Sequence, residues 1–110
     1  MSLSTHVLDN ARGVPAAGVR VRLERLDASE WVPVSDGVTD EDGRLRDWLP
    51  PGAFGRGTYR LTFGTGGYFA AQQVATFYPE VAITFTTADD GHHHVPLLLS
   101  PFAYSTYRGS

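Results

Sequence analysis

The four histidines are the residues of this chain best suited to proton chemistry. His6 lies near the start, and His92, His93 and His94 form a consecutive run near the end. An imidazole gains and loses a proton near neutral pH, so it can take a proton from water and return one to a leaving group. Two imidazoles at positions i and i+2 of a strand could instead share a zinc ion with His6, although no Cys, Asp or Glu has the spacing to complete that site. Solvated surface histidines are the ordinary alternative to both.

An arginine and the last residues of the chain could act on a polar substrate. Arg44 follows a tight Asp42-Gly43 turn, and the chain closes with Tyr107-Arg108-Gly109-Ser110. A guanidinium stays protonated, so Arg44 could stabilise developing negative charge but could not act as a base. Taken alone, Arg44 is as typical of a solvated hairpin, and Arg108 of a surface ion pair. The ending comes soon after the apolar run 95–99, which predicts an ordered terminal strand and not a frayed tail.

Composition limits the class of protein. A chain of 110 residues, 42% of them hydrophobic, predicts a single domain over residues 1–110. The net charge is -3 and the nine basic residues are all arginines, scattered without a cluster, so no nucleic-acid partner is expected. The absence of Cys fits a reducing compartment. No signal-peptide pattern and no apolar run of membrane-spanning length is present, so we expect a cytoplasmic protein with no membrane partner.

Strands must position the chemical groups, because the dominant sequence period is two. Apolar and polar residues alternate in three segments, 19–24, 59–63 and 81–86. Such alternation marks strands with one buried face. Turn signals such as Asp36-Gly37 and Gly64-Thr65-Gly66-Gly67 separate the candidates, and seven or eight short strands at this spacing predict a mainly β sandwich. The exception is segment 68–73, where Ala and Gln favour a short helix.

The parity of each strand predicts which side chains share a face. In a strand over residues 4–9, His6 points to one face while Asp9 points to the other. In segment 92–99, the set that contains His93 is the more apolar and therefore the better core face. His94 is thus expected on the opposite face, beside the terminal strand. It shares that face with Pro96, which lacks a donor for the sheet and favours an edge or irregular position.

Four separated motifs carry a resemblance to a known family. They are Ser4-Thr5-His6-Val7-Leu8-Asp9, Asp42-Gly43-Arg44, His94-Val95-Pro96-Leu97-Leu98-Leu99-Ser100-Pro101 and Tyr107-Arg108-Gly109-Ser110. In this order and spacing they resemble the transthyretin-like family, and within it the 5-hydroxyisourate hydrolase branch. The resemblance covers the whole length of the chain. It implies a transthyretin-like antiparallel β-sandwich of seven to eight strands with one short helix, and a homotetramer whose strands line a central channel with a site at each end.

The resemblance also implies a site and a reaction. The catalytic residues it implies are His6, Arg44, His94 and Ser110. The substrate contacts it implies are His6, Arg44, Tyr107 and Arg108. The implied reaction opens the six-membered ring of 5-hydroxyisourate, a product of urate oxidation, to 2-oxo-4-hydroxy-4-carboxy-5-ureidoimidazoline. The histidine pair would move the protons, with neither chosen as the base, and no metal or other cofactor is expected.

One position departs from the family pattern, and one relative offers a competing function. His93 stands where the family commonly has Tyr, and since parity turns it away from the site we expect a change in packing and not a loss of activity. Transthyretin shares the fold but binds hormone without chemistry. It has a Lys and a Thr where the hydrolases have histidines, and it lacks the Tyr-Arg-Gly-Ser ending. This chain contains no Lys, so the hydrolase branch is favoured, with a non-enzymatic small-molecule binding module as the alternative.

Overall fold

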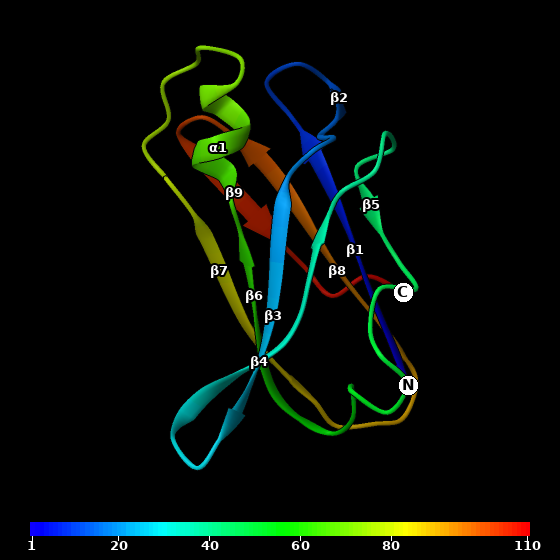
Figure 1. The fold of residues 1–110 in the computed structure, drawn as a ribbon. Coiled ribbons are helices and arrows are strands. Elements are labelled where there is room, and N and C mark those ends of the chain that lie inside the picture. The colour runs from blue at the N-terminus through cyan, green and yellow to red at the C-terminus, as the bar shows by residue number, and fades with distance from the viewer.

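Two β-sheets and one short helix make up the computed structural model, which describes residues 1–110 (Figure 1). One sheet contains β1 (Ser2–Asp9), β2 (Val14–Pro15), β5 (Arg44–Leu45), β8 (His92–Ser100) and β9 (Ala103–Thr106). The other contains β3 (Arg20–Asp27), β4 (Glu30–Val38), β6 (Gly57–Phe63) and β7 (Val81–Thr87). The helix, α1, spans Thr65–Ala70. The predicted mainly β sandwich with one helix is confirmed.

The order of strands brings the two ends of the chain together. The first sheet runs β2-β1-β8-β9, with β5 also paired to β1, and the second runs β4-β3-β6-β7. All pairs are antiparallel except β1 with β8, which is parallel and joins Ser4 to His94 and His6 to Pro96 in register. This one pair departs from the antiparallel expectation, and it forms between strands at opposite ends of the chain. It sets the two histidine motifs side by side.

The core lies between the sheets and confirms the predicted parity. A cluster of 16 apolar residues is buried there, including Val7, Leu97 and Leu99. Along β1 buried and less buried residues alternate without exception, so that His6 lies on the outer face. Each apolar side chain removed from water contributes about 1.5–3 kcal/mol to folding, which holds this parity in place.

Asp9 is the one carboxylate on the inner face of β1, and it is only 1% exposed. The Tyr68 hydroxyl donates to Oδ2 at 2.7 Å, and the backbone N–H groups of Ala11 and Arg12 donate to Oδ1 at 3.1 and 3.0 Å. Burial and then this hydrogen bond raise the pKa of Tyr68. Asp9 therefore ties the end of β1 to the helix and lies opposite to His6, as expected from parity.

The helix lies three residues earlier than expected, over Thr65–Ala70 and not over 68–73. Gly66 lies inside the helix and packs closely against the backbone of Pro79. Only glycine fits there, since a Cβ atom would lie 2.7 Å from the Pro79 carbonyl oxygen. Gln73, in the turn that follows the helix, has φ 59°, the left-handed conformation common just after a helix. Close packing against Pro79 therefore decides where the helix lies, and the local preference of Ala and Gln does not.

Asp36-Gly37, predicted as a turn, lies instead within β4. Gly37 is needed there for close approach, since a Cβ atom would lie 2.8 Å from a methyl group of Leu45. The actual hairpin turn falls at Ala28 and Ser29, both at positive φ, 48° and 73°. Neither is a usual residue for such a turn, which explains why the sequence pattern did not reveal it.

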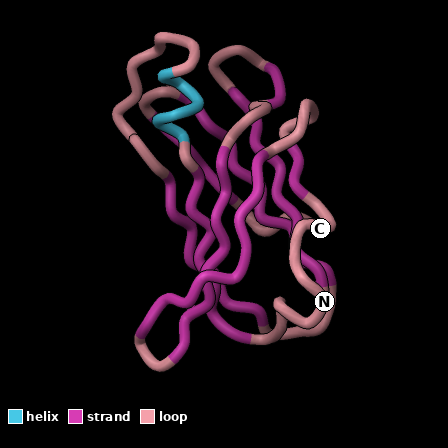
Figure 2. The backbone as a smooth tube through the Cα atoms, in the orientation of Figure 1, coloured by secondary structure: helices cyan, strands magenta, loops and turns pink.

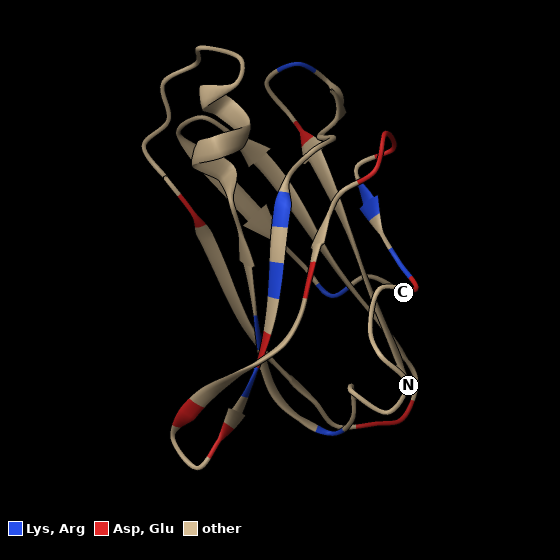
Figure 3. Cartoon of the chain, in the orientation of Figure 1, with Lys and Arg blue, Asp and Glu red and all other residues tan.

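Loops and charges are distributed around this framework. Loops join the strands mainly at the two ends of the sandwich (Figure 2). Acidic and basic segments are spread over several strands and loops of both sheets (Figure 3). No helix of the structure is long and apolar enough to cross a membrane.

Candidate active site

A cleft of about 430 Å³ opens beside the parallel pair of β1 and β8. Its lining residues are Ser2, Leu3, Ser4, Thr5, Arg44, Arg46, Asp47, His92, His94 and Ser110. Three of the four predicted catalytic residues, Arg44, His94 and Ser110, are therefore brought to one place from widely separated parts of the sequence. Figure 1 shows the C-terminus close to β5, the strand that carries Arg44.

His6, the fourth predicted catalytic residue, is half-buried next to this cleft and is not part of its lining. It is paired in register with Arg44 of β5. Its Nε2 lies 2.9 Å from the Asp42 carbonyl oxygen. A carbonyl only accepts, so Nε2 of His6 is the donor in this contact.

A tight turn positions Arg44. The carboxylate of Asp40 accepts the backbone N–H groups of Asp42 and Arg44, each at 2.9 Å. The N–H of Arg44 is the main cause that lowers the pKa of Asp40 below its usual value. Gly43, at φ 74°, completes the turn, and a Cβ atom there would overlap the Val7 carbonyl oxygen. The Asp-Gly-Arg motif therefore places a guanidinium at the cleft for structural reasons that the sequence shows.

His94 is half-buried at the edge of the cleft. Its Nδ1 lies 2.7 Å from the Ser4 hydroxyl. Burial is the main cause that lowers the pKa of His94 below 6.5, and the nearby His6, His92 and Arg44 lower it further. At neutral pH this imidazole is therefore uncharged and able to accept a proton.

The last residues of the chain lie directly against His94. The Gly109 N–H donates to the His94 carbonyl oxygen at 2.8 Å. A Cβ atom on Gly109 would lie 2.5 Å from Cδ2 of the His94 ring, so only glycine allows this approach. Ser110 then reaches the cleft. Gly109 was not assigned a role from the sequence, although its place in the terminal motif could have indicated one.

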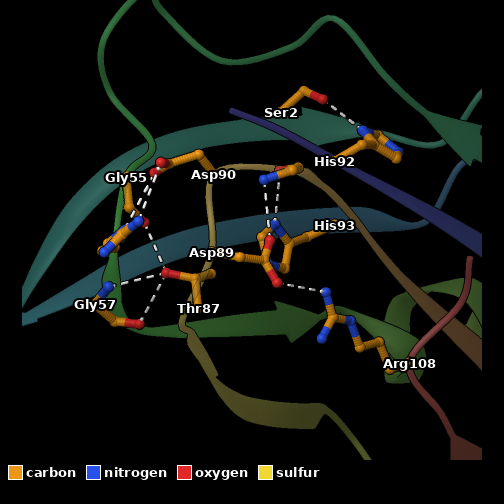
Figure 4. A network of polar contacts seen from close by, with 11 residues as sticks. Ser2, Gly55, Gly57, Thr87, Asp89, Asp90, His92, His93 and Arg108 are labelled. Atoms are coloured by element: carbon orange, nitrogen blue, oxygen red, sulfur yellow. Dashed lines mark hydrogen bonds and ion pairs between the residues drawn. The ribbon is translucent and has the colours of Figure 1, made fainter.

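Tyr107 and Arg108, the other predicted substrate contacts, do not reach the cleft within one chain. They line a separate crevice of about 330 Å³ between β7 and β8. The Arg108 guanidinium donates to the Asp89 carboxylate at 3.2 Å (Figure 4). This ion pair ties the terminal segment to the loop before β8.

His93 lies on the core side of β8 and is 5% exposed, which confirms that it faces away from the site. Nδ1 donates to the Gly91 carbonyl oxygen at 3.0 Å, and the ring packs edge-on against Phe54. Figure 4 shows His93 directed toward Asp89, while His92 points to Ser2. The neighbouring histidines therefore have separate environments.

Several residues of the cleft were not identified from the sequence. Ser2 and Ser4 alternate with buried residues on β1, so parity could have placed them on the face of His6. Arg46 lies two residues beyond Arg44, and Asp47 follows at φ 54°. No group of three or more His, Cys, Asp or Glu side chains is arranged to hold a metal ion.

The architecture and the cleft define a transthyretin-type sandwich with histidines and an arginine on the outer face of one sheet. The fold matches that of sea bream transthyretin, solved in complex with thyroxine, with a TM-score of 0.92 at 31% identity over 97% of this chain and 93% of that one. Residues 3–109 match the HIUase/Transthyretin family. The chain belongs to this family, as its motifs predicted.

Relatives within the family carry a hydrolase name. The 5-hydroxyisourate hydrolase of Deinococcus radiodurans is 48% identical over 98% of this chain and 95% of its own length. That of Mus musculus is 46% identical over 98% and 94%. The structure of Klebsiella pneumoniae 5-hydroxyisourate hydrolase matches with a TM-score of 0.88 at 37% identity, over the full length of both chains. Because transthyretin matches as well, the fold alone does not separate a hydrolase from a thyroxine-binding transthyretin, and the residues of the cleft must do so.

Proposed function

We propose that this protein hydrolyses 5-hydroxyisourate to 2-oxo-4-hydroxy-4-carboxy-5-ureidoimidazoline. The observation that carries the proposal is the convergence of Arg44, His94 and Ser110 on one cleft, with His6 beside it. Full-length similarity to proteins named 5-hydroxyisourate hydrolase supports it. These groups together offer a base, an acid and a fixed positive charge.

The proposed reaction needs only proton transfer and charge stabilisation. Nε2 of the neutral His94 takes a proton from water as the water oxygen attacks the lactam carbonyl carbon. Arg44 stabilises the negative charge that forms on the carbonyl oxygen. The carbon–nitrogen bond then breaks, and the proton on His94 passes to the leaving nitrogen. His6 and Ser110 orient the ring and the water.

An assembly of four copies would complete this site. Tyr107 and Arg108 border the neighbouring crevice, so we propose that they meet the substrate only where copies of the chain adjoin. The resemblance to the transthyretin-like family, which implies a homotetramer, supports such an assembly. Cytoplasmic location remains a prediction.

The proposal is tested by mixing the purified protein with freshly generated 5-hydroxyisourate and following its absorbance. We expect decay well above the spontaneous rate, unchanged after EDTA treatment because no step uses a metal. A rate equal to the spontaneous one would refute the hydrolase proposal. Loss of rate with EDTA, restored by Zn²⁺, would favour metal catalysis instead.

Small-molecule binding without chemistry is the second candidate. The match to a thyroxine-bound transthyretin favours it. The absence of any Lys and the presence of His6 and His94 weigh against it. A protein that binds an aromatic ligand but leaves the decay rate unchanged would support this candidate.

A further inference from the structure

Hydroxyl and imidazole groups alternate in a continuous chain along the outer face of β1 and β8. Ser2 Oγ is hydrogen-bonded to Nδ1 of His92 (Figure 4). Nε2 of His92 lies 2.9 Å from Ser4 Oγ, and the same hydroxyl lies 2.7 Å from Nδ1 of His94. The parallel register, which aligns Ser2 with His92 and Ser4 with His94, creates this arrangement. The chain therefore leads along the lining of the cleft from His94 to the exposed Ser2.

Both ring nitrogens of His92 are used in this chain, which allows two directions of polarity. A hydroxyl donates one hydrogen bond while accepting another, and a neutral imidazole has one donor and one acceptor. In one direction Ser2 donates to His92, His92 to Ser4, and Ser4 to His94, so the His94 proton is on Nε2. In the other direction every bond is reversed, and His94 carries its proton on Nδ1. Nε2 is then free to accept a proton in the cleft.

We propose that Ser2, His92 and Ser4 form a proton relay that switches His94 between base and acid during turnover. The proposal rests on the proposed function and assigns a positioning role to three residues outside the predicted catalytic set. His92 and the two serines line the cleft as well, and the role proposed for them is to act through His94.

The protons balance in each half of the cycle. As Nε2 of His94 accepts the proton of water, Nδ1 passes its own to Ser4, Ser4 to Nε2 of His92, and His92 from Nδ1 to Ser2. Ser2 releases a proton to solvent. When Nε2 of His94 donates to the leaving nitrogen, Ser2 takes a proton from solvent and every transfer reverses. No heavy-atom bond in the relay changes.

The surroundings of His94 disfavour its charged form, which is the form that the relay would avoid. His6, His92 and Arg44 are the groups whose charges act on His94, and Gly109 covers its ring without a charge. Burial disfavours a positive charge on His94 most, and these three neighbours disfavour it further. A relay that removes one proton as another arrives keeps His94 neutral throughout.

Two variants distinguish proton transfer along the relay from the hydrogen bonds that hold it in place. His92→Gln can still bond to Ser4 through its amide but cannot exchange donor and acceptor, whereas Ser4→Ala breaks the chain beside His94. We expect each to lower kcat by about tenfold or more, as part of the general acid–base contribution, with little change in KM. Ser100→Ala, a serine on the same strand that donates to the Ala103 carbonyl oxygen, is the matched control and should keep full activity.

The tautomer of His94, read from its ¹⁵N NMR shifts, tests the relay even if the hydrolase proposal fails. In the unaltered protein both neutral tautomers should be populated, and in His92→Gln one should dominate. Ser2→Ala, at an exposed position, should show the same loss of exchange without affecting folding. Unchanged tautomer populations and unchanged kcat in His92→Gln would overturn the relay. If the wild-type protein leaves 5-hydroxyisourate to decay at its spontaneous rate, but His92→Gln still changes the tautomer populations of His94, the hydrolase proposal alone would be overturned.

Discussion

Three consecutive histidines have three different environments in this protein. His92 is exposed between two serines, His93 is buried against Phe54, and His94 is half-buried at the cleft. Strand parity separates His93 from its neighbours, and the other two both line the cleft but differ in exposure, His92 being exposed and His94 half-buried. Residue type alone therefore does not define a role, and predictions at this scale depend on the immediate surroundings of each ring.

His6→Ala and His94→Ala should each remove most of the turnover while the fold is retained, since neither side chain lies in the core. The two histidines are proposed to act as a unit, so the double variant should lose little more than either single one. Initial rates with 5-hydroxyisourate and circular dichroism of all three variants are the measurements. Full activity in either single variant would remove that histidine from the mechanism.

The pH dependence of kcat/KM should follow the lowered pKa of His94. The neutral form is the base, so activity should rise with pH through a value below 6.5 and be constant at neutral pH. His94 binds a proton more readily in the unfolded chain than in the folded one. It therefore does not affect stability above about pH 6.5, and it destabilises the fold as the pH falls from there through its folded pKa. Asp40 and Asp89 have pKa values lowered below 3.8, chiefly by the N–H groups of Arg44 and Gly91. An acid limb of the kcat/KM profile centred at or above pH 6.5 would contradict the assignment of neutral His94 as the base.

Gly109→Ala should displace the His94 ring, because the added Cβ would lie 2.5 Å from Cδ2. A displacement of about 1 Å at a catalytic group can cost about 100-fold in rate, so we expect kcat to fall by one to two orders of magnitude. Gly55→Ala is the control, since a Cβ there meets no atom within 4 Å. Equal kcat for the two variants would show that Gly109 does not position His94.

At the scale of elements, local strain and close approach determine where strands turn. The β3–β4 hairpin closes with Ala28 and Ser29 at positive φ, whereas Gly37, in the favoured turn signal, is used inside β4 beneath Leu45. Non-glycine residues in the left-handed region cost about 1–2 kcal/mol each. The packing of Leu45 and the register of the hairpin outweigh this cost.

Replacing Ala28-Ser29 with Asn-Gly should stabilise the protein, because this pair is the preferred sequence of a two-residue turn with both φ positive. We expect a gain of about 1 kcal/mol, which raises Tm by about 4–8 °C in a chain of this size. Ser105→Gly, at a position in β9 without positive φ, is the control and should lower stability by about 0.5–1 kcal/mol. Thermal unfolding that shows no gain for Asn-Gly would mean the turn is not strained.

Across the whole molecule, exposed aromatic side chains gather near the C-terminal strand. Phe77 is 71% exposed, Phe102 69% and Tyr107 58%. The backbone N–H of Phe77 donates to the Pro101 carbonyl oxygen at 2.9 Å, which joins two of these segments. Apolar groups of this size are commonly covered in closed symmetric oligomers, which supports the proposed tetramer.

Deleting Arg108-Gly109-Ser110 should abolish hydrolysis, because the deletion removes Ser110 from the cleft and Gly109 from the His94 ring. Stability should change little, since the deletion removes a largely solvent-exposed ion pair between Arg108 and Asp89 and one backbone hydrogen bond from Gly109 to His94. A fused C-terminal tag should also impair turnover. Sedimentation should show a tetramer for both the full chain and the deletion.

Asp89→Asn weakens the same ion pair without shortening the chain and should keep most of the activity. A deletion variant with normal turnover, or a fully active monomer in sedimentation, would be incompatible with the proposed site.

Periodicity and motif order along the chain were sufficient to predict the sandwich, the outer-face positions of His6 and His94, and the presentation of Arg44 by its turn. These features depend on a two-residue period and on hydrogen bonds between near neighbours, so a linear sequence expresses them directly. The displaced helix and the Ala28-Ser29 turn could not be predicted, because contacts with Pro79 and Leu45 outweigh local preference.

The polar chain from Ser2 to His94 also required the folded structure. It depends on the parallel register of β1 and β8, strands from opposite ends of the sequence. The same folding brings Gly109 onto the His94 ring and Arg108 onto Asp89, away from the cleft. Many pairings of such distant segments satisfy the same alternation of buried and exposed residues, and only the simultaneous packing of both sheets on one core selects a single register.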